Sequence, residues 1–102
     1  KWDLLNKAGV YAYPNPANTA VNFHFATSAA SFEARVEVFD IAGQLVKTLE
    51  NVSVDPFSGR SRISWDMSHE SIASGVYLYI LRVKNITTGE TGKVVKKFAV
   101  IR

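Results

Sequence analysis

The chain has 102 residues, 47% hydrophobic and 21% charged, which are the proportions of one ordinary globular domain. It has no cysteine, which excludes thiol catalysis, thiolate metal sites and disulfide scaffolds, and no apolar run approaches the roughly 20 residues of a transmembrane helix. The net charge of +3 is unevenly placed, because the residues from Arg82 onward carry six basic side chains and one acidic, whereas the first 81 carry six basic and eight acidic.

The first quarter of the chain is predicted to hold two short strands joined by a rigid turn. Residues 1–8 have no clear period and are expected to be a linker or a frayed start, so the domain is predicted to span residues 9–102. The chain begins with lysine rather than methionine, which indicates a piece of a larger protein. Residues 9–13 alternate weakly and lead into Pro14-Asn15-Pro16, where two prolines remove two ladder donors. Residues 21–25 then alternate apolar with polar side chains, as a half-buried strand does.

The middle of the chain is predicted to contain a hairpin and one further strand. Residues 34–39 and 44–50 are its two strands, and Asp40 with Gly43 marks the turn, because aspartate accepts backbone donors and glycine adopts turn conformations. Residues 51–59 are predicted to be a loop. In residues 60–65 the alternation directs Ile63 and Trp65 toward the core.

The longest strand-like run follows, from Ser74 to Val83. Alternation assigns Tyr77, Tyr79, Leu81 and Val83 to the core, since the other face becomes basic at its end. After a polar turn, residues 93–101 are the last predicted strand, with Phe98 and Val100 inward. Seven short strands without a convincing helix predict an all-β fold, a seven-stranded antiparallel immunoglobulin-like β-sandwich.

Enzymatic chemistry has little support in the sequence. Ser68-His69-Glu70 contains the residue types of a catalytic triad, but adjacent residues do not converge on one another. The other histidine, His24, is predicted on an exposed strand face. The acidic residues lack the spacing of a calcium loop and the glycines are spread over separate turns. We therefore predict no catalytic residue, no metal site and no cofactor.

Four motifs occur in series along the chain. They are residues 13–18 (Tyr-Pro-Asn-Pro-Ala-Asn), residues 38–46 around the Asp-Ile-Ala-Gly turn, residues 72–77 with Gly-Val-Tyr, and the lysine-bearing last strand. In their order and spacing, over about residues 10–102, they resemble the C-terminal sorting domains of the type IX (Por) secretion system of Bacteroidetes-type bacteria. Carried over by position, the family's recurring motifs fall on Pro14, Asn15, Pro16, Gly75, Tyr77, Lys93, Lys96 and Lys97.

The resemblance implies a secretion signal rather than a catalyst. Such a domain directs an attached cargo through the outer membrane, and a surface sortase often removes it and attaches the cargo to lipopolysaccharide. The implied partners are the outer-membrane secretion machinery and its sortase or shuttle proteins, with no nucleic acid. The implied location is secreted or at the cell surface, after transit from the periplasm to the outer membrane.

Physical reasoning gives the last strand two alternative roles. An edge strand offers unpaired backbone groups to which another chain can add, including a second copy, and neighbouring lysines can select an acidic partner. Lysines on an edge strand can equally serve only to prevent aggregation.

Two other functions remain open from the sequence, a flagellar hook-capping-type immunoglobulin-like module and a carbohydrate-binding or adhesive β-sandwich. The second requires exposed aromatic rings, so the exposure of Trp65, Tyr77 and Tyr79 distinguishes it from a sorting domain.

Overall fold

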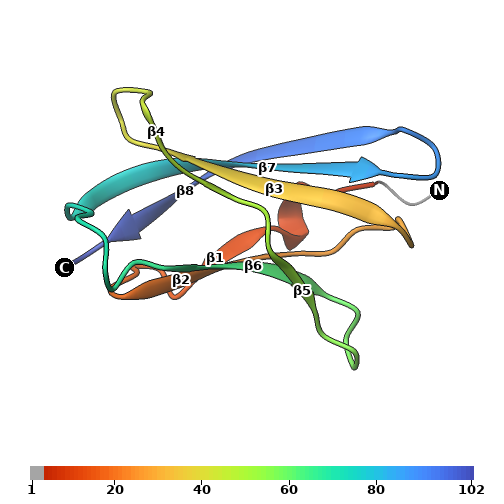
Figure 1. Ribbon diagram of the computed structural model, residues 1–102, viewed down its shortest axis with the longest axis horizontal. Helices are drawn as coiled ribbons and strands as arrows, with labels where there is room; N and C mark the ends of the chain where they lie inside the picture. The colour runs from red at the N-terminus through yellow and green to blue at the C-terminus, as the bar shows by residue number, and fades with distance from the viewer. Residues whose placement is uncertain (1–3) are drawn as a thin grey trace.

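Alternation of apolar and polar side chains builds two sheets that face each other across one core (Figure 1). The computed structural model describes residues 4–102. Both sheets are antiparallel and four-stranded, with strand orders β1-β2-β6-β5 and β4-β3-β7-β8. We call them the first and the second sheet. The strands are β1 (Tyr11–Tyr13), β2 (Ala20–Phe25), β3 (Phe32–Phe39), β4 (Leu45–Leu49), β5 (Val52–Val54), β6 (Ser61–Asp66), β7 (Gly75–Asn85) and β8 (Thr91–Val100).

The core is the set of inward-facing residues that the two-residue period selects. The predicted inward residues of β6, β7 and β8 are all buried: Ile63, Trp65, Tyr77, Tyr79, Leu81, Val83, Phe98 and Val100. Rings from both sheets meet at the centre, where the Phe23 centroid lies 4.7 Å from that of Tyr79 and 5.3 Å from that of Phe98. Tilted and edge-on aromatic pairs of this kind add to the stabilisation from burial alone.

The hairpin between β3 and β4 forms as the sequence predicts. The Asp40 carboxylate accepts hydrogen bonds from the backbone N–H of Ala42 and of Gln44, each at 2.9 Å. Gly43 has a φ of 83°, a left-handed conformation that glycine adopts without steric cost. The turn therefore depends on its first and fourth residues.

The strand count differs from the prediction of seven, because the predicted loop 51–59 contains β5. Val52–Val54 pairs with β6 and makes a second hairpin. Asp55 holds its turn by accepting the Phe57 N–H at 2.9 Å and the Ser58 hydroxyl at 3.0 Å. Val52 and Val54 stand among the turn-type residues Asn51, Ser53, Asp55 and Pro56, which predict a loop, so this element was missed.

The start of the described chain packs against the sandwich. Leu4 is buried, and Leu5 forms an isolated bridge with Thr27. A single 3₁₀ turn, η1 (Lys7–Gly9), follows and precedes the buried Val10. Residues 1–3 of the predicted linker lie outside the described residues, and the role of residues 1–8 as a linker stays a prediction. Nowhere in residues 4–102 is there a helix long and apolar enough to cross a membrane.

Candidate recognition site

At one end of the sandwich the proline motif lies beside the end of the chain. Ala17 forms a parallel bridge with Val100, in which the Ala17 N–H donates to the Ala99 carbonyl and the Ile101 N–H donates to the Ala17 carbonyl, both at 2.8 Å. The Asn15 side-chain oxygen accepts the Ala99 N–H at 3.0 Å. Prolines at 14 and 16 have no N–H to offer, which confines this segment to the sheet edge. The proline motif therefore covers the last part of the β8 edge.

The Gly-Val-Tyr motif meets the same end of the chain from the other side of β8. Gly75 is the register partner of Val100, and the Ser74 hydroxyl accepts the Arg102 N–H at 2.8 Å. The Arg102 guanidinium donates to the Glu70 carbonyl at 3.2 Å. We call this meeting point the terminal junction; it comprises Asn15, Ala17, Ser74, Gly75 and residues 99–102.

Tyr77 fixes the loop that leads into the junction. Its ring is buried, and its hydroxyl donates to the Ala73 carbonyl at 2.7 Å. The structure thus brings together five of the eight sequence-predicted site residues, Pro14, Asn15, Pro16, Gly75 and Tyr77, at or next to the terminal junction.

The three predicted lysines of β8 do not form one group. Lys96 lies on the inward-facing side of the strand, half-buried, and its ammonium group donates to the Val10 carbonyl. Lys93 and Lys97 are exposed on the opposite side. Because Phe98 and Val100 are inward, the same alternation in the sequence assigns Lys96 to the inner face.

The aromatic rings that could form a sugar platform are buried. The exposed fractions are 2% for Trp65, 8% for Tyr77 and 0% for Tyr79. The Trp65 indole N–H donates to the Glu70 carboxylate at 2.7 Å, while burial raises the pKa of Tyr79 to about 12. These three rings therefore do not stack on a carbohydrate.

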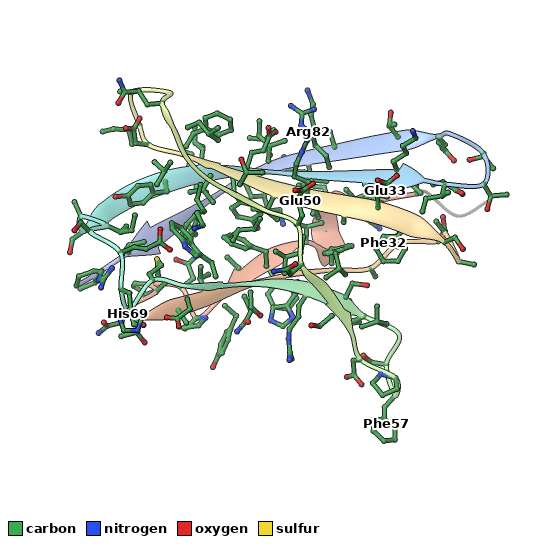
Figure 2. All side chains as sticks on the ribbon, in the orientation of Figure 1. Phe32, Glu33, Glu50, Phe57, His69 and Arg82 are labelled. Atoms are coloured by element: carbon green, nitrogen blue, oxygen red, sulfur yellow. The ribbon has the colours of Figure 1, made fainter. Side chains whose placement is uncertain are left out.

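The two histidines lie apart from each other and from any acidic cluster. His24 stacks on Tyr11 with centroids 4.7 Å apart, and burial, followed by the charges of Arg60 and Arg62, lowers its pKa from 6.5. His69 lies on the exposed loop between β6 and β7 (Figure 2). Within residues 4–102 no three histidine, aspartate or glutamate side chains gather closely enough to hold a metal ion.

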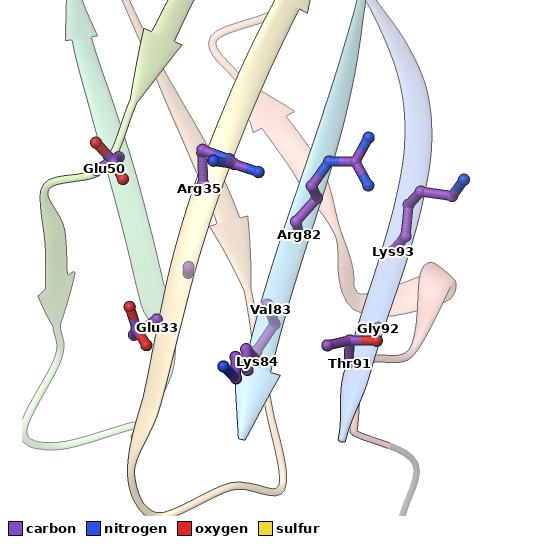
Figure 3. A pocket seen from close by; sticks show the side chains of 10 residues that line it. Glu33, Arg35, Glu50, Arg82, Val83, Lys84, Thr91, Gly92 and Lys93 are labelled. Carbon is purple, nitrogen blue, oxygen red and sulfur yellow. The ribbon is translucent and has the colours of Figure 1, made fainter. Parts of the chain in front are cut away.

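A depression of about 570 Å³ lies on the outer face of the second sheet. The register places Arg35 opposite Arg82, and Arg82 opposite Lys93, so three cations form a row across β3, β7 and β8 (Figure 3). Glu37 pairs with Arg82 at 2.7 Å. Like charges directly opposite each other destabilise a sheet, so folding alone does not favour this row. Its chemistry suits an anionic group.

Comparisons with known families and solved structures both give proteins of a secretion system. A family model described as "Secretion system C-terminal sorting domain" matches residues 11–100. Among solved structures, the chain is similar to the crystal structure of dimeric latent PorU from Porphyromonas gingivalis, with a TM-score of 0.70 and 27% sequence identity. That match covers 90% of this chain and 9% of the PorU chain, so the chain corresponds to a small part of that protein. No curated protein matches the chain.

Proposed function

The chain belongs to the family of secretion system C-terminal sorting domains, the secretion signals of the type IX system, and we propose that this system reads it through the surface of its last two strands. The domain marks the protein that carries it for export to the cell surface or for secretion. The observation that supports the site is the terminal junction, because it unites motifs that lie far apart in the sequence at one end of β8.

The recognition residues divide into two roles in this proposal. Asn15, Gly75, Tyr77 and Lys96 hold β8 in place, since their contacts are made within the domain, and Pro14 and Pro16 restrict the backbone on either side of Asn15. Lys93 and Lys97 contact the secretion machinery or its sortase or shuttle proteins, since their side chains are exposed.

The free part of the β8 edge is where another strand can add. The backbone groups of Ala99 and Ile101 point to the proline motif, so by alternation those of Lys93, Val95 and Lys97 point away from β7 in the same direction. Within residues 4–102 no backbone partner lies on that side of residues 93–97, so in this proposal a strand adds there and not at residues 99–101, and exchange between copies would use the same edge.

We also propose that the sandwich is immunoglobulin-like. Lettered in chain order as A, B, C, C′, D, E, F and G, the strands give sheets A-B-E-D and C′-C-F-G, which is the immunoglobulin arrangement with one added strand beside C. The bond from the Tyr77 hydroxyl to the Ala73 carbonyl is a further likeness, because immunoglobulin-like domains have a similar tyrosine near the start of strand F.

The domain has no catalytic role in this proposal. Ser68, His69 and Glu70 do not assemble, because the Glu70 carboxylate instead accepts the Trp65 indole N–H and lies 3.5 Å from the Lys47 ammonium. Removal of the domain by a sortase after export, with attachment of the cargo to the surface, belongs to the proposal as a step carried out by the partner.

An export assay tests the proposed function. Residues 1–102 are fused to the C-terminus of a reporter enzyme that is directed to the periplasm of a bacterium with a working type IX system. We expect reporter activity at the cell surface or in the medium. The two controls are the reporter without the domain and the fusion in a strain whose type IX translocon is inactivated, and both should keep activity in the periplasm. Retention of the fusion in the competent strain would contradict the proposal.

A further inference from the structure

The outer face of the second sheet carries apolar side chains that the core does not use. Val76, Leu78 and Ile80 lie along β7 on the side facing away from the first sheet, because Tyr77, Tyr79 and Leu81 between them are buried. Their cross-strand neighbours extend the surface on both sides. We call this set the outer apolar strip; it consists of Phe39, Leu45, Val76, Leu78, Ile80, Val95 and Ala99.

The strip is continuous across four strands. Leu45 lies opposite Phe39, and Phe39 lies opposite Leu78. On the other side, Ile80 lies opposite Val95 and Val76 opposite Ala99. Leu45 is 56% exposed, Val76 50% and Val95 45%, while the other members are half-buried. Contiguous exposed apolar surface in a soluble protein marks an interaction site rather than a requirement of the fold.

Cationic side chains border the strip. Lys97 lies opposite Leu78, between Val95 and Ala99 on β8, and the row of Arg35, Arg82 and Lys93 begins immediately beyond Ile80 and Val95. Figure 2 shows Arg82 directed away from the sandwich. On this face of β3, β7 and β8 five cationic side chains stand against two acidic ones, namely Arg35, Arg82, Lys84, Lys93 and Lys97 against Glu33 and Glu37.

We propose that the outer apolar strip and its cationic border are the docking surface for an acidic protein, one whose contact patch has an apolar centre and carboxylates at its rim. The inference rests on the proposed function and names the chemistry of the partner. Apolar contacts at the centre supply affinity, and the cationic border supplies orientation and encounter rate. A second copy of this chain is a poorer occupant, because a two-fold contact sets a patch against itself and brings its cations together.

Two double variants test the surface in the export assay. Val76→Thr with Val95→Thr removes apolar area but keeps β-branched side chains, and Lys93→Glu with Lys97→Glu reverses the border charge. Matched controls on the first sheet are Val54→Thr, at another half-exposed valine, and Arg62→Glu, at another exposed cation. Each purified domain is first shown by circular dichroism and thermal unfolding to fold like the unsubstituted one.

The expected result is a loss of export of about tenfold or more in both strip variants, corresponding to about 1.4 kcal/mol of binding, with both controls exported normally. Normal export of both strip variants would overturn the inference and the contact role of Lys93 and Lys97, while leaving the role of the domain as a type IX secretion signal intact. Retention of the unsubstituted fusion would instead overturn the proposed function.

Site-specific photo-cross-linking identifies the occupant. A benzoylphenylalanine placed at Val95 in the exported fusion, with one at Val54 as the control, is activated in cells and the cross-linked peptide is sequenced. We expect a protein segment with carboxylates beside apolar residues, found at Val95 only. Changing those carboxylates to lysine should restore export of the Lys93→Glu, Lys97→Glu variant. A cross-link to a second copy of the domain, to a lipid, or to a segment without acidic residues would overturn the assignment.

Discussion

The two outer faces of the sandwich differ, although the two sheets have the same number of strands. On the first sheet the outward side chains are mostly polar, and the Ser64 hydroxyl donates to the Asn22 side chain at 2.5 Å across β2 and β6. On the second sheet the outward side chains of β7 form the outer apolar strip. An antiparallel sheet with one solvated face is expected to be apolar inside and polar outside. The first sheet departs from this pattern mainly at the exposed rings of Tyr11 and Tyr13 on its edge strand, whereas the second carries a strip of apolar side chains across its four strands that folding does not require.

The largest change in the free energy of unfolding should come from a substitution in the core, where the inner faces of the two sheets pack together. Phe98→Ala removes a buried ring that contacts the rings of Phe23 and Tyr79, and we expect it to lower the free energy of unfolding by about 3–5 kcal/mol in urea denaturation. Val95→Ala, three residues away on the outer face, is the matched control and should cost less than about 1 kcal/mol. Equal losses would show that the strip is part of the stabilising core and would remove the contrast between the faces.

A smaller effect should separate the two buried tyrosines of β7. Tyr77→Phe deletes the hydrogen bond to the Ala73 carbonyl and should destabilise the domain by about 1 kcal/mol. In the described chain the Tyr79 hydroxyl is buried without a hydrogen-bond partner, so Tyr79→Phe should leave stability unchanged or raise it. Thermal unfolding of both variants measures the difference. A greater loss in Tyr79→Phe would contradict the assigned contacts.

A change of a few tenths of a kcal/mol should follow from reversing one charge in the cationic row. Arg35→Glu places a carboxylate directly opposite Arg82, and the new cross-strand pair should stabilise the domain slightly. Chemical denaturation at low salt measures this change, with Arg62→Glu on the first sheet as the control. Destabilisation by Arg35→Glu would mean that the row contributes to folding, and would weaken its assignment as a contact surface.

The smallest expected effect is a pH dependence confined to the first sheet. The pKa of His24 is lowered in the folded state, so on acidification from pH 6.5 the unfolded state takes up the proton first and stability falls until the pH passes below the folded-state pKa. His24→Gln should flatten this part of the stability profile, measured by chemical denaturation over this pH range. An unchanged profile in His24→Gln would contradict the environment assigned to that imidazole.

Short-range patterns predicted much of the fold. Alternation placed Tyr77, Tyr79 and Phe98 in the core, and the Asp40 turn followed from two residue types three positions apart, Asp40 and Gly43. The short strand β5 was missed, since its two valines lie among residues that favour turns. The candidate site was predicted as a set of motifs rather than as a surface. Asn15 and Ala99 are 84 positions apart, and no local pattern indicates that they share a hydrogen bond.

The sequence also did not predict that the lysines of the last strand have different environments. The lysines of β8 were treated as one basic group, whereas Lys96 donates to the Val10 carbonyl and only Lys93 and Lys97 remain exposed. The cationic row needs the register of three strands, because Arg35, Arg82 and Lys93 align only when β3, β7 and β8 pair as observed. The register of the strands is set by tertiary contacts. The count of charges along the sequence therefore predicted a basic region but not the alignment of its side chains across the sheet.

The hydrogen bond between Asn15 and Ala99 also determines at which stage of synthesis and folding the export signal forms. A ribosome or an inner-membrane translocon releases residue 15 long before residue 99, and the two must then find each other in the folded domain. A short peptide with the sequence of the last strand has the lysines but lacks both the covered edge and the aligned row. A partner protein that binds this surface therefore binds only domains that have folded as far as their last strand. The export signal thus also selects for folded domains.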